Sequence, residues 1–184
     1  EKSIISSSDV IRNSVSLSSN ISEAIKIMIK CIKSKNKIIL FGNGGSAADA
    51  QHIASELIGR YKQERDSYPA IALTTDSSII TSIANDYSYE MVFSRQCESI
   101  VKENDVVIGI STSGNSKNVE NALKVSKTNG ATTIGLLGNN GGKIKEFVDV
   151  PIIVNSTNTA TIQEVHRVIY HIICDFIEND MKEA

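Results

Sequence analysis

The sequence has no cysteine pattern typical of disulfides or metal sites, and its acidic and basic residues are nearly balanced. Each of these absences excludes a class of protein. Three cysteines (Cys31, Cys97 and Cys174) are an odd number without CxxC spacing. We therefore expect reduced core thiols with no metal or disulfide role. Lys and Arg number 19 against 21 Asp and Glu, with no dense basic run. This balance argues against nucleic-acid binding.

Long apolar runs are also missing. The longest are only a few residues, far short of the roughly 20 that cross a bilayer. Residues 1–20 lack the uninterrupted apolar stretch of a signal peptide. The sequence thus predicts a cytoplasmic protein without a membrane partner. Its 184 residues, 41% of them hydrophobic, fit one globular domain spanning residues 1–184.

Short, β-branched apolar runs alternate with segments of helical periodicity from residue 37 onward. Such runs are typical of strands buried on both faces, and the alternation is typical of a parallel sheet. We predict a doubly wound, five-stranded α/β fold with strand order 2-1-3-4-5 and ligands at the carboxyl ends of the strands. The predicted strands are 37–41, 70–73, 106–110, 132–137 and 150–154, and the intervening helical segments are about 46–62, 77–102, 116–129 and, shorter, 142–147.

Two amphipathic helices frame this predicted sheet. Residues 20–34 and 159–182 carry apolar side chains at three- and four-residue spacing, and serines at 14, 16, 18 and 19 separate the first from an earlier helix. Residues 1–35 are thus a helical extension of an α/β core at 36–184 that ends in a long helix. The two amphipathic helices carry more apolar surface than one sheet face covers. They therefore pack either against another subunit or within the chain, and the sequence leaves both alternatives open.

Two loops have the composition of anion sites. In Gly42-Asn-Gly-Gly-Ser46 three glycines turn the backbone before a helix begins, which presents amides to an anion. Gly42, Gly44 and Ala47 also fit the dinucleotide pattern G-x-G-x-x-A. The candidate ribose ligand, Asp76, comes 34 residues after Gly42 instead of about 20. Asp76-Ser-Ser-Ile is equally typical of a plain helix N-terminus.

The second loop, Ser111-Thr-Ser-Gly-Asn-Ser116, offers four hydroxyls, a flexible glycine and a following helix N-terminus. These groups suit a phosphate monoester, although a serine-rich turn that caps its own helix has the same composition. Its pairing with the glycine loop favours binding. A third turn at 138–142 fits either a helix entry or a lid.

These loops, together with Gly59-Arg-Tyr61, Asn85-Asp86, Gln163-Glu-Val-His166 and His171, resemble the phosphoheptose isomerases of the sugar-isomerase (SIS) domain superfamily. The resemblance covers nearly the whole chain, while the hydroxyl loop by itself is shared by SIS domains in general. It implies a homotetramer with active sites at subunit interfaces. It also implies substrate contacts from Asn43, Gly44, Gly45, Glu56, Asn85, Asp86, Ser111, Thr112, Ser113, Ser116 and Gln163.

The candidate chemistry lies on two helices. His52 and Glu56 are four residues apart, so they share one helix face beside the glycine loop, although an ordinary surface pair has the same spacing. On the last helix Gln163 and His171 match the family's second half-site. His166 lies about 60° around that helix from Gln163 and is expected to be structural or adjacent to substrate.

The resemblance implies a divalent ion, zinc, held by His52, Glu56, Gln163 and His171. Nitrogen and oxygen donors without a thiolate predict moderate affinity. Eight residues separate Gln163 from His171, about 12 Å along a straight helix. Both reach one ion only if their side chains converge or the helix bends.

The expected reaction converts sedoheptulose 7-phosphate to D-glycero-D-manno-heptose 7-phosphate through an enediolate, for bacterial surface heptose in lipopolysaccharide or capsule. We assign Glu56 as the base and His171 as the acid, with the metal or loop amides stabilising the oxyanion. Glu56 is then both a ligand and a base. The alternative class is a non-catalytic SIS tetramer that senses a phosphosugar or binds a protein such as a replication initiator.

Overall fold

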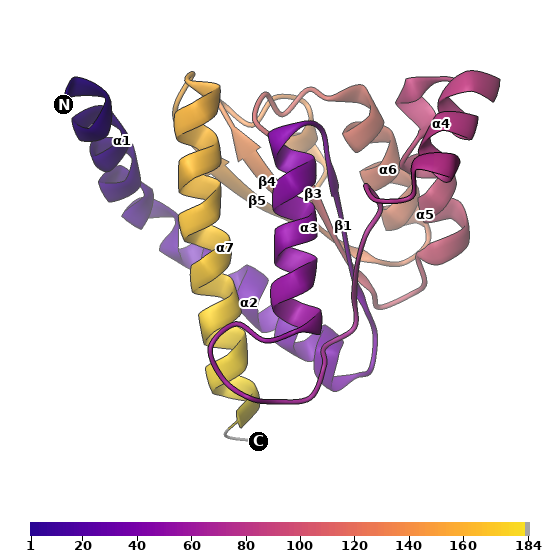
Figure 1. Ribbon diagram of the computed structural model, residues 1–184, viewed down its shortest axis with the longest axis horizontal. Helices are drawn as coiled ribbons and strands as arrows, with labels where there is room; N and C mark the ends of the chain where they lie inside the picture. Colours follow the sequence, from indigo (N-terminus) through magenta and orange to yellow (C-terminus); the bar gives the residue numbers. More distant parts are fainter. Residues whose placement is uncertain (183–184) are drawn as a thin grey trace.

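A computed structural model describes residues 1–182 as a five-stranded parallel sheet with helices on both faces (Figure 1). The strand order is β2-β1-β3-β4-β5 and every neighbouring pair is parallel, which confirms the predicted fold class and order. The strands are β1 (Ile38–Gly42), β2 (Ala70–Ala72), β3 (Val106–Ser111), β4 (Thr132–Gly138) and β5 (Val150–Val154).

The helices of the described residues are α-helices and short 3₁₀ turns. They are α1 (Lys2–Asn13), α2 (Ser18–Lys33), α3 (Gly45–Ile58), α4 (Ser77–Asp86), α5 (Ser94–Ile100), α6 (Lys117–Thr128) and α7 (Thr159–Lys182), with 3₁₀ segments η1 (Ser14–Leu17), η2 (Tyr89–Met91) and η3 (Ile144–Glu146). The serines at 14 and 16 lie in η1, where the predicted break between the first two helices occurs, while Ser18 and Ser19 begin α2.

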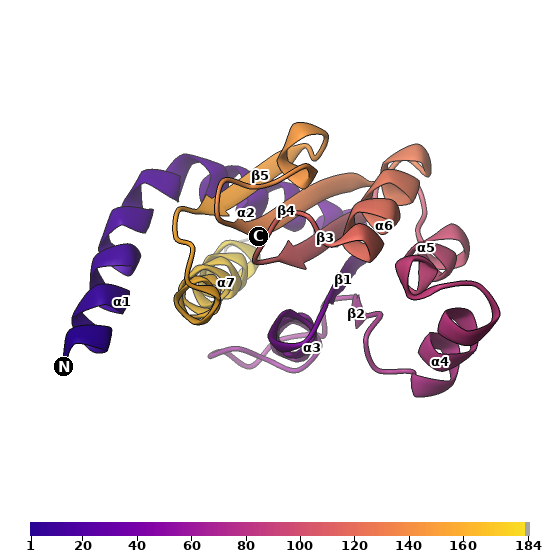
Figure 2. The ribbon, with the colours of Figure 1, turned by 90° about the horizontal axis from the view of Figure 1, so that it is seen from above.

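The side chains of the central strands alternate between two cores. Ile38 and Leu40 of β1 face a core shared with α2, α3 and α7, whereas Ile39 and Phe41 face a second core shared with α5 and α6. This is the pleat of a strand buried on both faces, and it explains the continuous apolar runs in the sequence. Figure 2 shows α3 and α7 next to each other on one side of the sheet and α6 on the other.

Helix α1 stands away from the sheet (Figure 1) and has no buried residue. An apolar groove lies where α1 and α2 meet α7, and its walls include Ile11, Val15, Ile172 and Phe176. Phe176 is 58% exposed and Val15 73%. The surplus of apolar surface predicted for these helices is therefore present in the chain taken alone.

Three helical predictions need correction. The segment 46–62 ends as a helix at Ile58, because the N–H groups of residues 61–63 turn away to the side chain of Glu178 instead of continuing the helical ladder. The segment 77–102 is split into α4, η2 and α5, since Ser88 is extended (φ −167°, ψ 159°). The segment 142–147 forms only the 3₁₀ turn η3.

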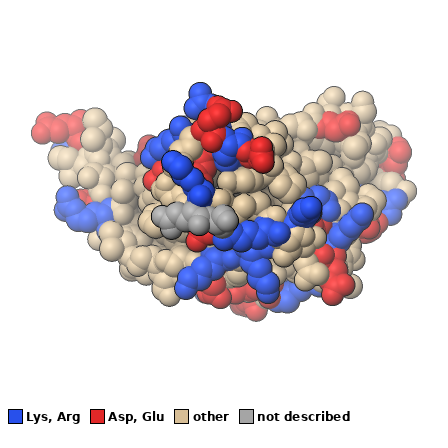
Figure 3. All heavy atoms as spheres, turned by 90° about the horizontal axis from the view of Figure 1, so that it is seen from below, with Lys and Arg blue, Asp and Glu red and all other residues tan. Residues whose placement is uncertain are grey.

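The three cysteines are free and buried, as expected. Between residues 1 and 182, no helix combines the length and apolar character needed to span a membrane. Lys and Arg side chains lie among Asp and Glu side chains on the face seen in Figure 3. Ion pairs link the two signs at the end of α7, where Lys62 Nζ lies 2.9 Å from Asp175 Oδ1 and Lys33 Nζ 2.9 Å from Asp180 Oδ1.

Candidate active site

The hydroxyl loop follows β3, where the carboxyl ends of the strands meet. Ser111 Oγ lies 2.9 Å from Ser116 Oγ and 3.4 Å from Ser113 Oγ, and it accepts a hydrogen bond from the backbone N–H of Gly114. Gly114 has a positive φ of +65°, a conformation that glycine adopts without strain. The loop thus gathers three hydroxyls and a backbone turn at the N-terminus of α6, a suitable place for an anion.

The turn at 138–142 supports this loop from behind. Asn139 Nδ2 donates to the carbonyl of Thr112 (2.8 Å), and the N–H of Ile144 donates to the carbonyl of Gly114 (3.1 Å). A Cβ on Gly114 would collide with the backbone of Gly141. The two turns also share a polar pocket of about 480 Å³ lined by Ser113, Asn115, Asn139, Asn140, Asn155 and Thr157.

The glycine loop lies next to the hydroxyl loop because β1 and β3 are neighbours. Asn43 and Asn118, the latter on α6, exchange two amide hydrogen bonds of 2.9 Å. Tyr89 also donates its hydroxyl hydrogen to Asn43 Oδ1 (2.9 Å). Gly44 (φ +54°) precedes α3, so both loops present helix N-termini at the same edge of the sheet.

The two helices beyond these loops bring together His52, Glu56 and His171, each offering a metal-ligating atom within 4.8 Å of the others. His52 Nε2 lies 2.9 Å from Glu56 Oε1 on the same face of α3. The ring of His171, from α7, lies edge-on to that of His52, with centroids 5.2 Å apart. His52 and Glu56 of α3 and His171 of α7 thus lie together, which is the predicted contribution of two helices to one site.

A hydrogen-bond chain fixes the orientation of His52. The hydroxyl of Tyr170 lies 3.5 Å from Asp49 Oδ1 and 3.2 Å from His52 Nδ1. A carboxylate only accepts hydrogen bonds, so Nε2–H of His52 donates to Glu56 Oε1 across 2.9 Å, and Nδ1 of His52 accepts from the hydroxyl of Tyr170. A metal ion bound here would take the place of the Nε2 proton, between the imidazole and the carboxylate.

The environment lowers the pKa of His171, first through burial and second through the neighbouring His52. His171 is therefore neutral at neutral pH, the form in which an imidazole binds a metal or accepts a proton. Burial is the main reason that the pKa of Asp49 is raised, against the opposing hydrogen bond of Arg167.

The other predicted residues lie in different places. Gln163 lies against the glycine loop, since a Cβ on Gly45 would collide with its side-chain amide. Asn85 and Asp86 are exposed at the end of α4, where the amide of the first donates to the carboxylate of the second (2.9 Å). His166 is fully buried and donates from Nε2 to the carbonyl of Leu137 (3.0 Å), which makes it structural.

Asp76 caps a helix. Its Oδ1 accepts the N–H of Ile79 at 2.9 Å, at the N-terminus of α4. The side chain thus has the role that the simple helix-start interpretation gives it, and the dinucleotide alternative loses its candidate ribose ligand.

Comparisons with known proteins show which family the chain belongs to. Residues 6–138 match the SIS domain model. The phosphoheptose isomerase of Aliarcobacter butzleri (strain RM4018) is 55% identical over 159 residues, which make up 86% of this chain and 84% of that relative. The chain belongs to the phosphoheptose isomerase family of SIS-domain proteins. Its fold also matches solved structures of two family members, phosphoheptose isomerases from Neisseria gonorrhoeae (TM-score 0.92, 39% identity, covering 97% of this chain and 96% of that one) and Francisella tularensis (TM-score 0.94, 34% identity, covering 97% and 95%).

Sequence reasoning missed several residues of this family member's site. Asn118 and Tyr89 tie the two loops together, and Tyr170 orients His52. The sequence marks Tyr61 only as part of the Gly59-Arg-Tyr61 motif, yet its ring stacks on His171 with centroids 5.6 Å apart and planes 26° apart. The motif draws attention to the residue, but no local pattern predicts its contact with His171.

Proposed function

We propose that this chain isomerises sedoheptulose 7-phosphate to D-glycero-D-manno-heptose 7-phosphate. One observation carries the proposal: a carboxylate from α3 and an imidazole from α7 meet, with His52, in a site whose ligand atoms lie within 4.8 Å of one another. Two of these residues, His52 and Glu56, lie on α3, the helix that begins at the glycine loop. The names of relatives that are 50–55% identical, all phosphoheptose isomerases, support the same reaction.

The phosphate belongs at the hydroxyl loop, where Ser111, Ser113 and Ser116 gather at the N-terminus of α6. His52 is seven residues beyond Gly45, about 10 Å along the axis of α3. Because the glycine loop and the hydroxyl loop follow the neighbouring strands β1 and β3, this separation suits a substrate whose phosphate and reacting carbons lie at opposite ends of one carbon chain. We assign the remaining substrate contacts, as predicted, to Asn43, Gly44, Gly45, Glu56, Asn85, Asp86, Thr112 and Gln163.

In the reaction, Glu56 removes a proton from C1 of the ketose, beside the C2 carbonyl, and an enediolate forms. Glu56 then returns the proton to C2, which gives the aldose. His171 moves a proton from O1 to O2, so that the oxygens change roles without a net change of protons. Its lowered pKa suits this exchange, because a neutral imidazole both takes up and releases a proton easily near neutral pH.

The donor set of His52, Glu56 and His171 fits a divalent ion, and zinc matches two imidazoles and one carboxylate. When bound, such an ion would supply positive charge for stabilising an oxyanion. The contact of Tyr170 with Nδ1 of His52 (3.2 Å) supports this assignment, because it orients the ring so that Nε2 faces Glu56. Gln163 stays a prediction as the fourth ligand, because its amide lies at the level of Gly45 in this chain.

We further propose that the chain assembles as a homotetramer with sites at subunit interfaces, in the cytoplasm. The exposed apolar groove between α1, α2 and α7 supports assembly, since groups such as Phe176 and Val15 are then removed from water. Burying such side chains stabilises an interface by about 25 cal/mol for each Å² of apolar surface.

The test is a coupled assay for aldoheptose 7-phosphate with sedoheptulose 7-phosphate as substrate. Formation of product at a rate that saturates with substrate is the expected result. Thermal stabilisation by the substrate without any product would instead identify a binding module, the alternative class.

A further inference from the structure

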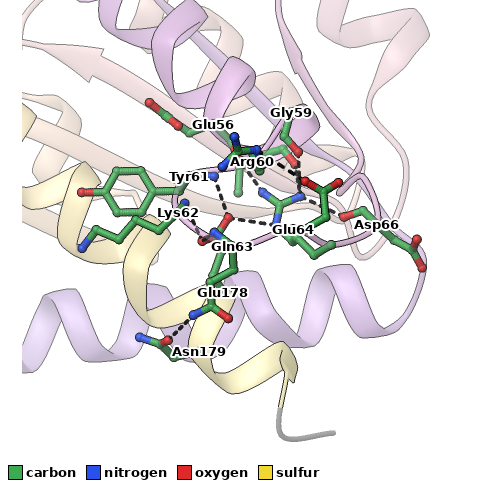
Figure 4. A network of polar contacts seen from close by, with 12 residues as sticks. Glu56, Gly59, Arg60, Tyr61, Lys62, Gln63, Glu64, Asp66, Glu178 and Asn179 are labelled. Carbon is green, nitrogen blue, oxygen red and sulfur yellow. Dashed lines mark hydrogen bonds and ion pairs between the residues drawn. The ribbon is translucent and has the colours of Figure 1, made fainter.

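The carboxylate of Glu178, on the last helix, is the anchor of the loop that follows α3. It is 3% exposed and accepts three consecutive backbone N–H groups, from Tyr61 (2.6 Å), Lys62 (2.8 Å) and Gln63 (3.0 Å). Arg65 adds a charged hydrogen bond from Nε (3.1 Å). Figure 4 shows Glu178 projecting from α7 into this loop.

Four donors keep this buried group ionised. Burial acts to raise the pKa of Glu178, but the backbone N–H groups and Arg65 outweigh it and lower the pKa. Charged hydrogen bonds inside a protein are stronger and shorter than neutral ones. The loop backbone is thus held in one conformation by a carboxylate from a distant part of the chain.

Arg65 extends the same network to the end of α3. Its Nη2 donates to the carbonyl of Glu56 (2.7 Å), and its Nη1 donates to the carbonyls of Leu57 (2.9 Å) and Gly59 (3.3 Å). The last carbonyls of a helix lack partners within the helix. The guanidinium therefore ties the turn that carries Glu56 to Glu178.

The loop in turn places an aromatic ring on the site. Tyr61, whose N–H makes the shortest of the bonds to Glu178, stacks on His171 with ring planes 26° apart. Lys62 Nζ also lies 4.9 Å from the centroid of the Tyr61 ring. The orientation of His171 is consequently limited by Tyr61 as well as by His52 and Tyr170.

We propose that Glu178 is a positioning residue for the isomerisation: it fixes the backbone at Tyr61 so that this ring holds the imidazole of His171 in the orientation for proton transfer. The proposal rests on the proposed function, in which His171 exchanges protons with the sugar oxygens. Glu178 itself touches no reacting atom. Its influence passes through the loop and the stacked ring.

The first test compares two substitutions on α7. Glu178→Gln puts an amide N–H₂ group against the N–H donors, so we expect kcat to fall about 10- to 100-fold, as for a misplaced catalytic group, while KM changes less than about twofold. Asp175→Asn removes the ion pair with Lys62 Nζ of the same loop but leaves the backbone bonds in place. It is expected to keep the kcat of the unchanged protein, and a kcat for Glu178→Gln equal to that of Asp175→Asn would overturn the proposal.

The second test separates positioning from stability. Tyr61→Ala removes the ring that stacks on His171 and should lower kcat as much as Glu178→Gln does. If Glu178 acts through this ring, the double variant is no slower than Tyr61→Ala alone. Losses that multiply in the double variant, or a normal kcat for Tyr61→Ala, would overturn the proposal.

Tyr61 is only partly buried, so Tyr61→Ala decides the question even where Glu178→Gln fails to fold. The proposed function fails separately, through absence of product with the unchanged protein.

Discussion

Glu56 Oε1 lies 2.9 Å from His52 Nε2, and both side chains point to His171 on the neighbouring helix. As the proposed base, Glu56 needs a carboxylate that accepts a proton from carbon. Glu56→Gln keeps the size of the side chain but removes this capacity. We expect the variant to fold and its kcat to fall by about 10²- to 10⁴-fold in the coupled assay.

Glu103→Gln, an exposed substitution before β3, serves as the control and should have normal activity. Near-normal turnover by Glu56→Gln would show that another group is the base.

Removal of metal should inactivate the protein. A chelator is expected to abolish turnover, and zinc should restore it, because His52, Glu56 and His171 form a donor set for a divalent ion. Elemental analysis should find less metal in His52→Ala than in His166→Gln, whose substituted residue lies outside the site. Equal metal content in the two variants would contradict the assignment.

The buried histidine predicts how stability depends on pH. Burial lowers the pKa of His166 to about 4 from an ordinary 6.5, against the partial opposition of its bond to Leu137. Below pH 6.5, His166 therefore binds a proton in the unfolded chain but not in the folded chain. This contribution to stability is complete above pH 6.5 and is lost as the pH falls toward 4, about 2 kcal/mol of it at pH 5.

Urea unfolding at pH 7.5 and pH 5, at one protein concentration, measures this loss. In His166→Gln the difference between the two pH values should shrink by about the same amount. An unchanged difference would mean that other groups govern the acid sensitivity; His171, whose pKa is also lowered, is the first to test by His171→Gln.

Gly114 and Gly44 allow backbone strain to be distinguished from collision. Both have positive φ, +65° and +54°, but a Cβ on Gly114 would strike the backbone of Gly141 while a Cβ on Gly44 meets nothing within 4 Å. Gly114→Ala should therefore lose about 1–3 kcal/mol more stability than Gly44→Ala, the usual cost of overpacking. Calorimetry of the two variants checks this, and equal losses would argue against close packing of the two turns.

The apolar groove predicts the effect of a charge on α7. Phe176→Glu places a carboxylate where we propose that a second subunit packs, so light scattering should detect a smaller assembly. Activity should fall in parallel if the sites are completed at interfaces. Ile79→Glu, at an exposed apolar residue of α4 outside the groove, should leave the assembly intact. A full-size assembly of Phe176→Glu would locate the interface elsewhere.

The strands could be predicted closely because burial on both faces leaves a simple trace in the sequence. The predicted run 37–41 is β1 at Ile38–Gly42, and 150–154 is β5 without change. Helix ends were harder, because they depend on distant groups. Residues 59–62 continue the helical pattern of α3, yet the N–H groups of Tyr61 and Lys62 bond to a carboxylate more than 100 positions away.

The site was predictable to a similar degree. The i, i+4 pair His52 and Glu56 and the hydroxyl loop could be read from local spacing, since each lies within one element. Gln163 and His171 needed the family resemblance, and only the structure separates them: the first lies by Gly45 and the second by His52. The contact of Tyr61 with His171 has no local signature, because the two residues come from different elements.

The bond between Tyr61 and Glu178 spans 117 positions of sequence. During synthesis, the loop after α3 therefore leaves the ribosome long before the carboxylate that holds it. Strands β1, β3 and β4 can pair in the meantime, but the ring over His171 has no fixed backbone until the final helix docks. We therefore expect the contact between Tyr61 and His171 to form late in folding, once α7 has docked.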